Sequence, residues 1–131
     1  MAYNILIVDD SGAMRSVIKR TVEMSGIEVG QYYQADSGKT ALETLEKEWI
    51  DLVLTDINMP EMNGIEMIEH MAANGLLSSI PVIVVSTEAS KTRIKQLKEK
   101  GVKGYVHKPF TPEQISNEIT KVIGVCHAGN D

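Results

Sequence analysis

The sequence of 131 residues has few cysteines and no long apolar run, and each shortage excludes a class of protein. The single cysteine, Cys126, excludes an intrachain disulfide and a zinc site built from several cysteines, which favours a reducing compartment. The longest apolar runs, such as residues 81–85, are far shorter than the roughly 20 residues that span a bilayer. The N-terminus shows neither a basic segment nor a cleavage site, so we expect a cytoplasmic protein.

Charge is unevenly distributed along the chain. The 13 Lys and Arg and the 18 Asp and Glu give a formal charge of −5 at pH 7. Residues 88–108 hold seven of these cations but only Glu88 and Glu99, so this segment carries +5 and the remainder −10. The acidic remainder disfavours nucleic acids and anionic membranes as partners. The basic segment would attract an acidic partner. The simpler interpretation of this segment is a solvated helix face.

Two apolar patterns alternate along the chain and predict one α/β domain. Short apolar runs rich in β-branched residues are typical of buried strands, and weaker runs follow the same spacing. The strands are expected at residues 5–8, 28–33, 52–54, 82–85 and 103–106. A helical period follows each of them, around Ile18, Leu45 and Ile68, then in a polar helix at residues 90–100, and last around Ile119. Five strand–helix repeats predict a doubly wound parallel sheet over residues 1–124, with a flexible tail at 125–131.

Cap signals support these helix positions. Ser11 and Ser37 are expected to begin two helices as N-caps, and Gly26 and Gly75 to end two as C′ residues. A capping box with Pro at the first helical position is expected at residues 111–114.

Polar residues end nearly every predicted strand. These residues are Asp9, Asp10, Asp56, Ser86, Thr87 and Lys108. The carboxyl ends of parallel strands meet at one edge of the sheet, where ligands bind in open α/β folds. Clustered carboxylates repel one another unless a cation lies among them, and oxygen ligands suit Mg²⁺ better than zinc. The pattern therefore predicts a magnesium site.

Each of these residues also has a structural explanation. Asp9 and Asp10 are also typical of turns and helix caps, and Asp56 of the turn that follows a strand. Lys108 on its own would be an ordinary surface lysine. The regular placement at strand ends favours the site.

Four segments carry a family resemblance. They read ILIVDD at residues 5–10, LVLTDINMPEMNG at 52–64, VVSTEA at 84–89 and GYVHKPFTPE at 104–113. Over about residues 4–123 the chain resembles receiver domains of response regulators, in particular single-domain chemotaxis regulators. The resemblance implies a flavodoxin-like sheet with strand order 2-1-3-4-5 and five helices.

The resemblance also implies roles for the acidic residues. Asp56 would accept a phosphoryl group from a histidine kinase as a carboxylate nucleophile. Asp10, Asp56 and the main-chain carbonyl of Asn58 would hold Mg²⁺ directly, and Asp9 would act through a bound water. The protein would not be an enzyme acting on other substrates, but it would assist its own phosphorylation and dephosphorylation.

Further roles follow from the same resemblance. Lys108 would pair with the phosphoryl oxygens, and its bond to Pro109 would be cis. Ser86, where many family members have Thr, and Tyr105 would form the switch. Asn58 and Glu88 would tune the lifetime of the phosphoryl group.

The output surface is also implied by the resemblance. Because no effector domain is expected after residue 123, the output would be another protein, possibly the flagellar motor switch. Its acidic segment would bind a basic face that includes Lys91, Lys95, Lys98 and Tyr105. The protein is expected to be a monomer with no membrane insertion.

Other functions stay open at the level of sequence. A phosphorelay intermediate would use the same residues. An aspartyl-phosphate phosphatase would need a second Asp where the chain has Asn58, and a flavodoxin-like cofactor binder would need a less acidic first turn. Trp49 is expected to pack at a helix end. The spacing of His70, His107 and His127, and the pair of His127 with Cys126, indicate neither catalysis nor a metal site.

Overall fold

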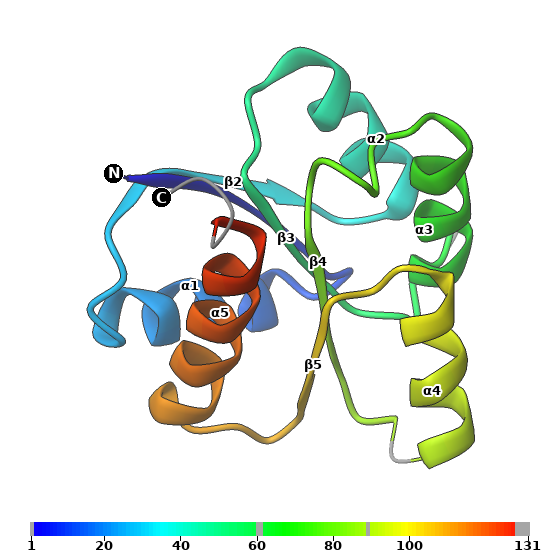
Figure 1. Cartoon of the computed structure of the whole chain (residues 1–131). Helices are drawn as coiled ribbons and strands as arrows, with labels where there is room; N and C mark the ends of the chain where they lie inside the picture. The colour runs from blue at the N-terminus through cyan, green and yellow to red at the C-terminus, as the bar shows by residue number, and fades with distance from the viewer. Residues whose placement is uncertain (1, 60–61, 89, 128–131) are drawn as a thin grey trace.

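The computed structural model describes residues 2–59, 62–88 and 90–127, in which strands and helices alternate along the chain (Figure 1). The strands are β1 (Tyr3–Val8), β2 (Val29–Ala35), β3 (Leu52–Thr55), β4 (Val82–Ser86) and β5 (Gly104–His107). The helices are α1 (Gly12–Met24), α2 (Gly38–Lys47), α3 (Gly64–Ala73), α4 (Lys91–Lys100) and α5 (Pro112–His127). In these described ranges no helix is long and apolar enough to cross a membrane.

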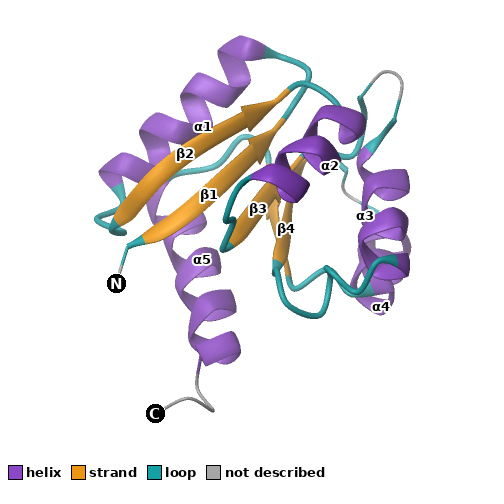
Figure 2. Cartoon of the chain, turned by 90° about the horizontal axis from the view of Figure 1, so that it is seen from above, coloured by secondary structure: helices purple, strands orange, loops and turns teal. Residues whose placement is uncertain are grey.

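The five strands form one parallel sheet in the order β2-β1-β3-β4-β5. Val8, the last residue of β1, pairs with Ala35 on one side and with Thr55 on the other, so these three strands end at the same level. Helices α1 and α5 cover one face of the sheet, and α2, α3 and α4 cover the other (Figure 2). The doubly wound fold and the strand order expected from the resemblance are both confirmed.

The alternation of side chains along each strand divides the core in two. In β1, Ile5 and Ile7 pack with Ile18 of α1 and with α5, whereas Leu6 and Val8 pack toward α2 and α3. All four strand residues are fully buried, which is why the strand reads as a continuous apolar run. This buried run is followed directly by the two aspartates Asp9 and Asp10.

The predicted helix caps are confirmed. Ser11 Oγ accepts a hydrogen bond from the main-chain nitrogen of Met14, 3.2 Å away, and Ser37 forms a capping box with Thr40. Gly26 and Gly75 follow α1 and α3 with φ of 84° and 75°. A left-handed conformation at these positions ends a helix most easily at glycine. At the start of α5, Thr111 and Gln114 bond reciprocally, as predicted.

Several element ends differ from the predictions by a few residues, and the ends of β2 and α5 are examples. Strand β2 continues to Ala35, because its pairing with β1 extends that far. Helix α5 continues to His127, so residues 125–127 of the expected tail are helical, although Gly124 favours a helix end. Residues 128–131 lie outside the described residues, and the division into domain and tail stays a prediction.

Candidate functional site

Three carboxylates meet at the carboxyl edge of the sheet. Asp9 and Asp10 directly follow β1 and Asp56 directly follows β3, and one carboxylate oxygen from each lies within 4.8 Å of the others. The main chain holds this edge, because the nitrogen of Asp56 donates to the carbonyl of Val8 at 2.9 Å and that of Asp9 to Ala35 at 3.1 Å. The clustering expected from the strand ends is present.

Lys108 lies between two of these carboxylates. Its Nζ is 2.9 Å from Oδ2 of Asp9 and 3.3 Å from Oδ2 of Asp56. The side chains of Lys108, Asp9 and Asp56 are only 12%, 3% and 13% exposed, so the attraction acts with little solvent screening. Interpreting Lys108 as an ordinary surface lysine is therefore wrong. The bond from Lys108 to Pro109 is cis, as the resemblance implies.

The second oxygens of the two buried carboxylates are held by the main chain. Oδ1 of Asp9 accepts from the nitrogen of Ser11 at 2.9 Å, and Oδ1 of Asp56 accepts from the nitrogen of Ile57 at 2.7 Å. Asp10, by contrast, is exposed and makes no hydrogen bond or ion pair within the described part of the chain. Two carboxylates are thus fixed, and the third is open to a ligand from solvent.

This donor set fits a hard divalent cation. Mg²⁺ prefers oxygen ligands and keeps several of its waters, and the exposed carboxylate of Asp10 leaves room for them. Zinc would favour His or Cys, which the described carboxylate cluster does not contain. Asn58, expected to contribute its carbonyl, is exposed two residues after Asp56. Asp10 and Asp56, with the carbonyl of Asn58, would hold Mg²⁺.

Strand β4 brings a buried hydroxyl to the same edge. Ser86 is fully buried and pairs with His107 on β5, and its carbonyl accepts from the nitrogen of Lys108 at 2.9 Å. Its Oγ accepts from the nitrogen of Glu88 at 3.2 Å. Thr87, also predicted at this edge, is exposed. Only Ser86 of the two hydroxyls is therefore enclosed beside Lys108.

Tyr105 lies on β5, an outer strand of the sheet, and contacts the main chain at the end of β4. Its ring packs against the core beneath α3 and α4. Its hydroxyl lies within hydrogen-bonding distance of the carbonyls of Glu88 and Ser86, the latter at 3.2 Å. Burial raises the pKa of Tyr105, and the negative charges of Glu88 and Asp56 raise it further. The tyrosine is thus coupled electrostatically to the carboxylate edge.

The basic face on α4 is exposed. Lys91, Lys95 and Lys98 are exposed, and in the described ranges none has an acidic group within 4.0 Å. Their spacing of four and three residues places them on one side of the helix. The structure thus leaves these three cations available to a partner and separate from the carboxylate cluster.

The histidines and the tryptophan were not predicted to belong to the site. His70 is exposed on α3 and His107 is exposed at the end of β5, whereas the side chains of Cys126 and His127 lie outside the described residues. The prediction that Trp49 packs at a helix end is wrong, because it is 78% exposed. Its indole nitrogen donates to Asp51 at 3.2 Å, which holds the ring in the loop before β3.

Two residues that support the site were not predicted. Arg15 of α1 donates to the main-chain carbonyl of Asp9, and sequence reasoning passed over it because it resembles any polar residue of an amphipathic helix. Gly64 begins α3 so close to Asp56 that a Cβ atom there would collide with the Asp56 carbonyl. An Asn-Gly pair before a helix was a usable signal for a tight approach.

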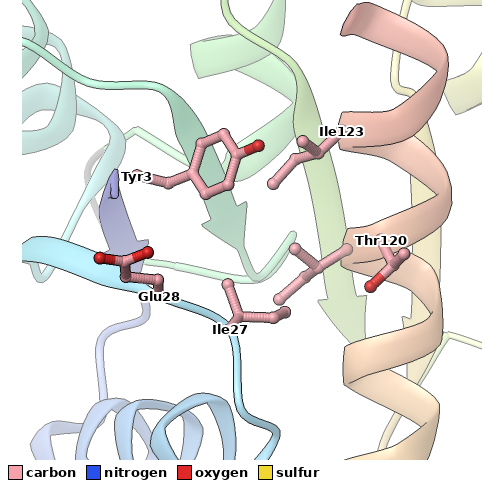
Figure 3. Close-up of a pocket in the computed structure, with 6 residues that line it drawn as sticks. Tyr3, Ile27, Glu28, Thr120 and Ile123 are labelled. Atoms are coloured by element: carbon pink, nitrogen blue, oxygen red, sulfur yellow. The ribbon is translucent and has the colours of Figure 1, made fainter. Parts of the chain in front are cut away.

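A cavity of about 310 Å³ lies at the opposite end of the molecule, between α5 and the start of β1 (Figure 3). Its lining consists of Tyr3, Ile27, Glu28, Ile119, Thr120 and Ile123. Tyr3 begins β1, whereas Asp9 follows its end, so the cavity and the carboxylate cluster occupy opposite edges of the sheet. The cavity is therefore separate from the candidate site.

Known proteins resemble this chain in sequence and in fold. The family model for the response regulator receiver domain matches residues 5–120. Chemotaxis protein CheY-3 of Vibrio cholerae is 38% identical over 90% of this chain and 89% of its own length, and CheY1 of Helicobacter pylori is 37% identical over 92% and 96%. A CheY-like receiver domain protein from Methanospirillum hungatei superposes with a TM-score of 0.83 and 28% identity, covering 98% of this chain and 99% of that one.

Proposed function

Because the chain belongs to the response regulator receiver domain family of two-component signalling, we propose that Asp56 is its phosphoacceptor. The phosphoryl group would come from the phosphohistidine of a histidine kinase. The observation that supports this most strongly is the position of Lys108, whose ammonium contacts both Asp9 and Asp56 beside the open carboxylate of Asp10. A cation in contact with the acceptor is what the transfer of an anionic group to a carboxylate requires.

The proposed transfer uses a carboxylate oxygen of Asp56 as the nucleophile. A P–O bond to Asp56 forms as the P–N bond of the phosphohistidine breaks, and the imidazole leaves with the electron pair. Lys108 offsets the charge of the incoming phosphoryl oxygens. Bound Mg²⁺, held by Asp10, Asp56 and the carbonyl of Asn58, with Asp9 acting through a water, would neutralise further charge on those oxygens.

Ser86 and Tyr105 would transmit the modification. In the described contacts Ser86 Oγ only accepts a hydrogen bond, so its hydrogen is available to a phosphoryl oxygen. Movement of Ser86 would shift the carbonyls of residues 86 and 88, which lie against the Tyr105 hydroxyl. Asn58 and Glu88, on either side of the acceptor, would tune how long the phosphoryl group persists.

We further propose that the output is chemotaxis, since two relatives over most of the chain are chemotaxis proteins. The exposed Lys91, Lys95 and Lys98 would bind an acidic segment of a partner, with the flagellar motor switch as the expected one. Phosphoryl transfer from the kinase and binding of the partner would both take place in the cytoplasm. A phosphorelay intermediate would share every site residue and would differ only in passing the phosphoryl group onward.

Phosphorylation by a small donor tests the acceptor. The full chain, incubated with Mg²⁺ and acetyl phosphate, is expected to gain one phosphoryl group by intact-mass spectrometry, and chelation of Mg²⁺ is expected to prevent this. Asp56→Asn should abolish the gain. Asp51→Asn is the matched control, because Asp51 precedes the same strand at the opposite edge of the sheet. A phosphoryl group retained in Asp56→Asn would contradict the proposal.

A further inference from the structure

Arg15 connects helix α1 to the ends of two strands. Its Nη1 donates to the main-chain carbonyl of Asp9 at 2.5 Å, and its Nε donates to Oε1 of Gln34 at 3.0 Å. Gln34 lies on β2 and pairs with Ile7 of β1. The planar guanidinium thus holds two acceptors from neighbouring strands in one fixed geometry.

The carbonyl that Arg15 holds belongs to a buried residue. Asp9 is 2% exposed, and among the described residues only Arg15 donates to its carbonyl oxygen. A buried acceptor without a donor is costly, so removal of Arg15 would favour rotation of this peptide toward another partner. The same peptide carries the nitrogen of Asp10, and because peptide groups are planar, its rotation redirects the Asp10 side chain.

The positive charge of Arg15 has a separate effect that opposes this one. Arg15 has no carboxylate within 4.0 Å among the described residues, so it does not pair with Asp9, Asp10 or Asp56. A cation near the cluster would nevertheless repel a divalent cation. If charge alone mattered, neutralising Arg15 would tighten Mg²⁺ binding, whereas if positioning mattered, the same change would weaken it.

We propose that Arg15 is a positioning residue for the metal-binding carboxylates, acting through the peptide between Asp9 and Asp10. By holding the Asp9 carbonyl, Arg15 keeps the carboxylate of Asp10 close to that of Asp56. This inference rests on the proposed function, since it assigns Arg15 to the Mg²⁺ site of that function. Gln34 supports Arg15 from the neighbouring strand.

The affinity for Mg²⁺ distinguishes the two effects. We would titrate the full chain with Mg²⁺ and follow the amide signals of Asp10, Ile57 and Asn58 by NMR. The single tryptophan is unsuitable as a probe, because Trp49 precedes β3 and is 78% exposed. Arg15→Gln is expected to weaken Mg²⁺ binding by about 10- to 100-fold, the usual effect of removing an outer partner of a metal ligand.

Three further variants complete the comparison. Arg15→Lys keeps the charge but replaces the fork by one point donor, so a smaller weakening is expected. Gln34→Leu removes only the Nε partner and should weaken binding by less than about 10-fold. Arg20→Gln, on the exposed side of the same helix, is the matched control and should leave the affinity unchanged.

Arg15→Gln binding Mg²⁺ as tightly as the unaltered protein, or more tightly, would overturn the inference. Urea unfolding without Mg²⁺ shows whether each variant is folded. If Arg15→Gln is unfolded, Gln34→Leu becomes the test, and an unchanged Mg²⁺ affinity in that variant would overturn the inference. Acetyl phosphate labelling of the unaltered protein tests the proposed function separately. Normal labelling of Asp56 together with unchanged affinities in the Arg15 variants would remove the inference and leave the function standing.

Discussion

The lysine at the carboxyl edge and the lysines of α4 show how burial decides what a charge does. The side chain of Lys108 is 12% exposed and contacts two carboxylates within 3.3 Å. Lys91 and Lys95 are exposed and unpaired among the described residues. The attraction between Lys108 and its carboxylates acts at short range with little screening. The charges on α4 instead attract distant partners, and this attraction weakens with salt. The difference separates a site for chemistry from a surface for recognition.

Lys108→Met tests the buried side of this comparison and has the largest expected effect. Without Lys108, Asp9 and Asp56 lose their cation while they remain mostly buried. We expect the free energy of unfolding to fall by about 3 kcal/mol in urea titrations without Mg²⁺, since breaking a buried ion pair leaves an uncompensated charge. Mg²⁺ should restore part of this loss.

Lys100→Met is the matched control for that variant. Nζ of Lys100 lies 3.5 Å from Oε2 of Glu69, but the two side chains are 42% and 56% exposed. Exposed ion pairs contribute little, so the loss should stay below about 0.5 kcal/mol. Equal losses in the two variants would show that burial does not distinguish the two regions.

Charge reversal tests the exposed side. Lys91→Glu combined with Lys95→Glu should slow association with an acidic peptide by about tenfold at low salt, and the difference should shrink as salt is added. Phosphorylation of Asp56 should be unaffected, because these residues are separate from the carboxylate cluster. Lys39→Glu combined with Lys47→Glu, both exposed on α2, is the matched control. A reduction that persists at high salt would indicate direct contacts and not steering.

The smallest expected effect concerns Tyr105, which lies between the two regions. Its pKa is raised above the ordinary 10.0 mainly by burial, with smaller contributions from Glu88 and Asp56. Asp56→Asn should therefore lower the pKa measured by NMR titration, but not to 10.0. Asp51→Asn should leave it unchanged. Because the folded state holds this proton more tightly, stability should fall as pH rises from about 10 through the raised pKa.

The fold and the carboxylate cluster were predictable because both follow from local patterns. Continuous apolar runs marked the buried strands, and parallel strands with charged ends have to bring Asp9 and Asp56 to one edge. The contacts of Lys108 needed more than pattern, since a lysine after a strand is usually solvated. The family resemblance supplied that position and the cis bond that follows it.

Two side-chain positions, those of Arg15 and Trp49, were not predictable from the sequence pattern. Arg15 resembles any cation on a helix, and only the folded chain shows its guanidinium at the Asp9 carbonyl. Trp49 was expected to pack, because large aromatic side chains are usually well buried. The loop before β3 instead turns it outward and bonds its indole to Asp51. Such positions depend on loop geometry, which periodicity does not encode.

We propose that a phosphoryl group on Asp56 changes binding at the surface formed by Lys91, Lys95 and Lys98 of α4 and Tyr105 of β5. The most direct measurement is the affinity of the full chain for an acidic segment of the proposed partner, the flagellar motor switch, with and without phosphorylation, by calorimetry. We predict binding tighter by about 5- to 150-fold after phosphorylation, the usual range of coupling between two sites. Equal affinities in the two states would contradict the account.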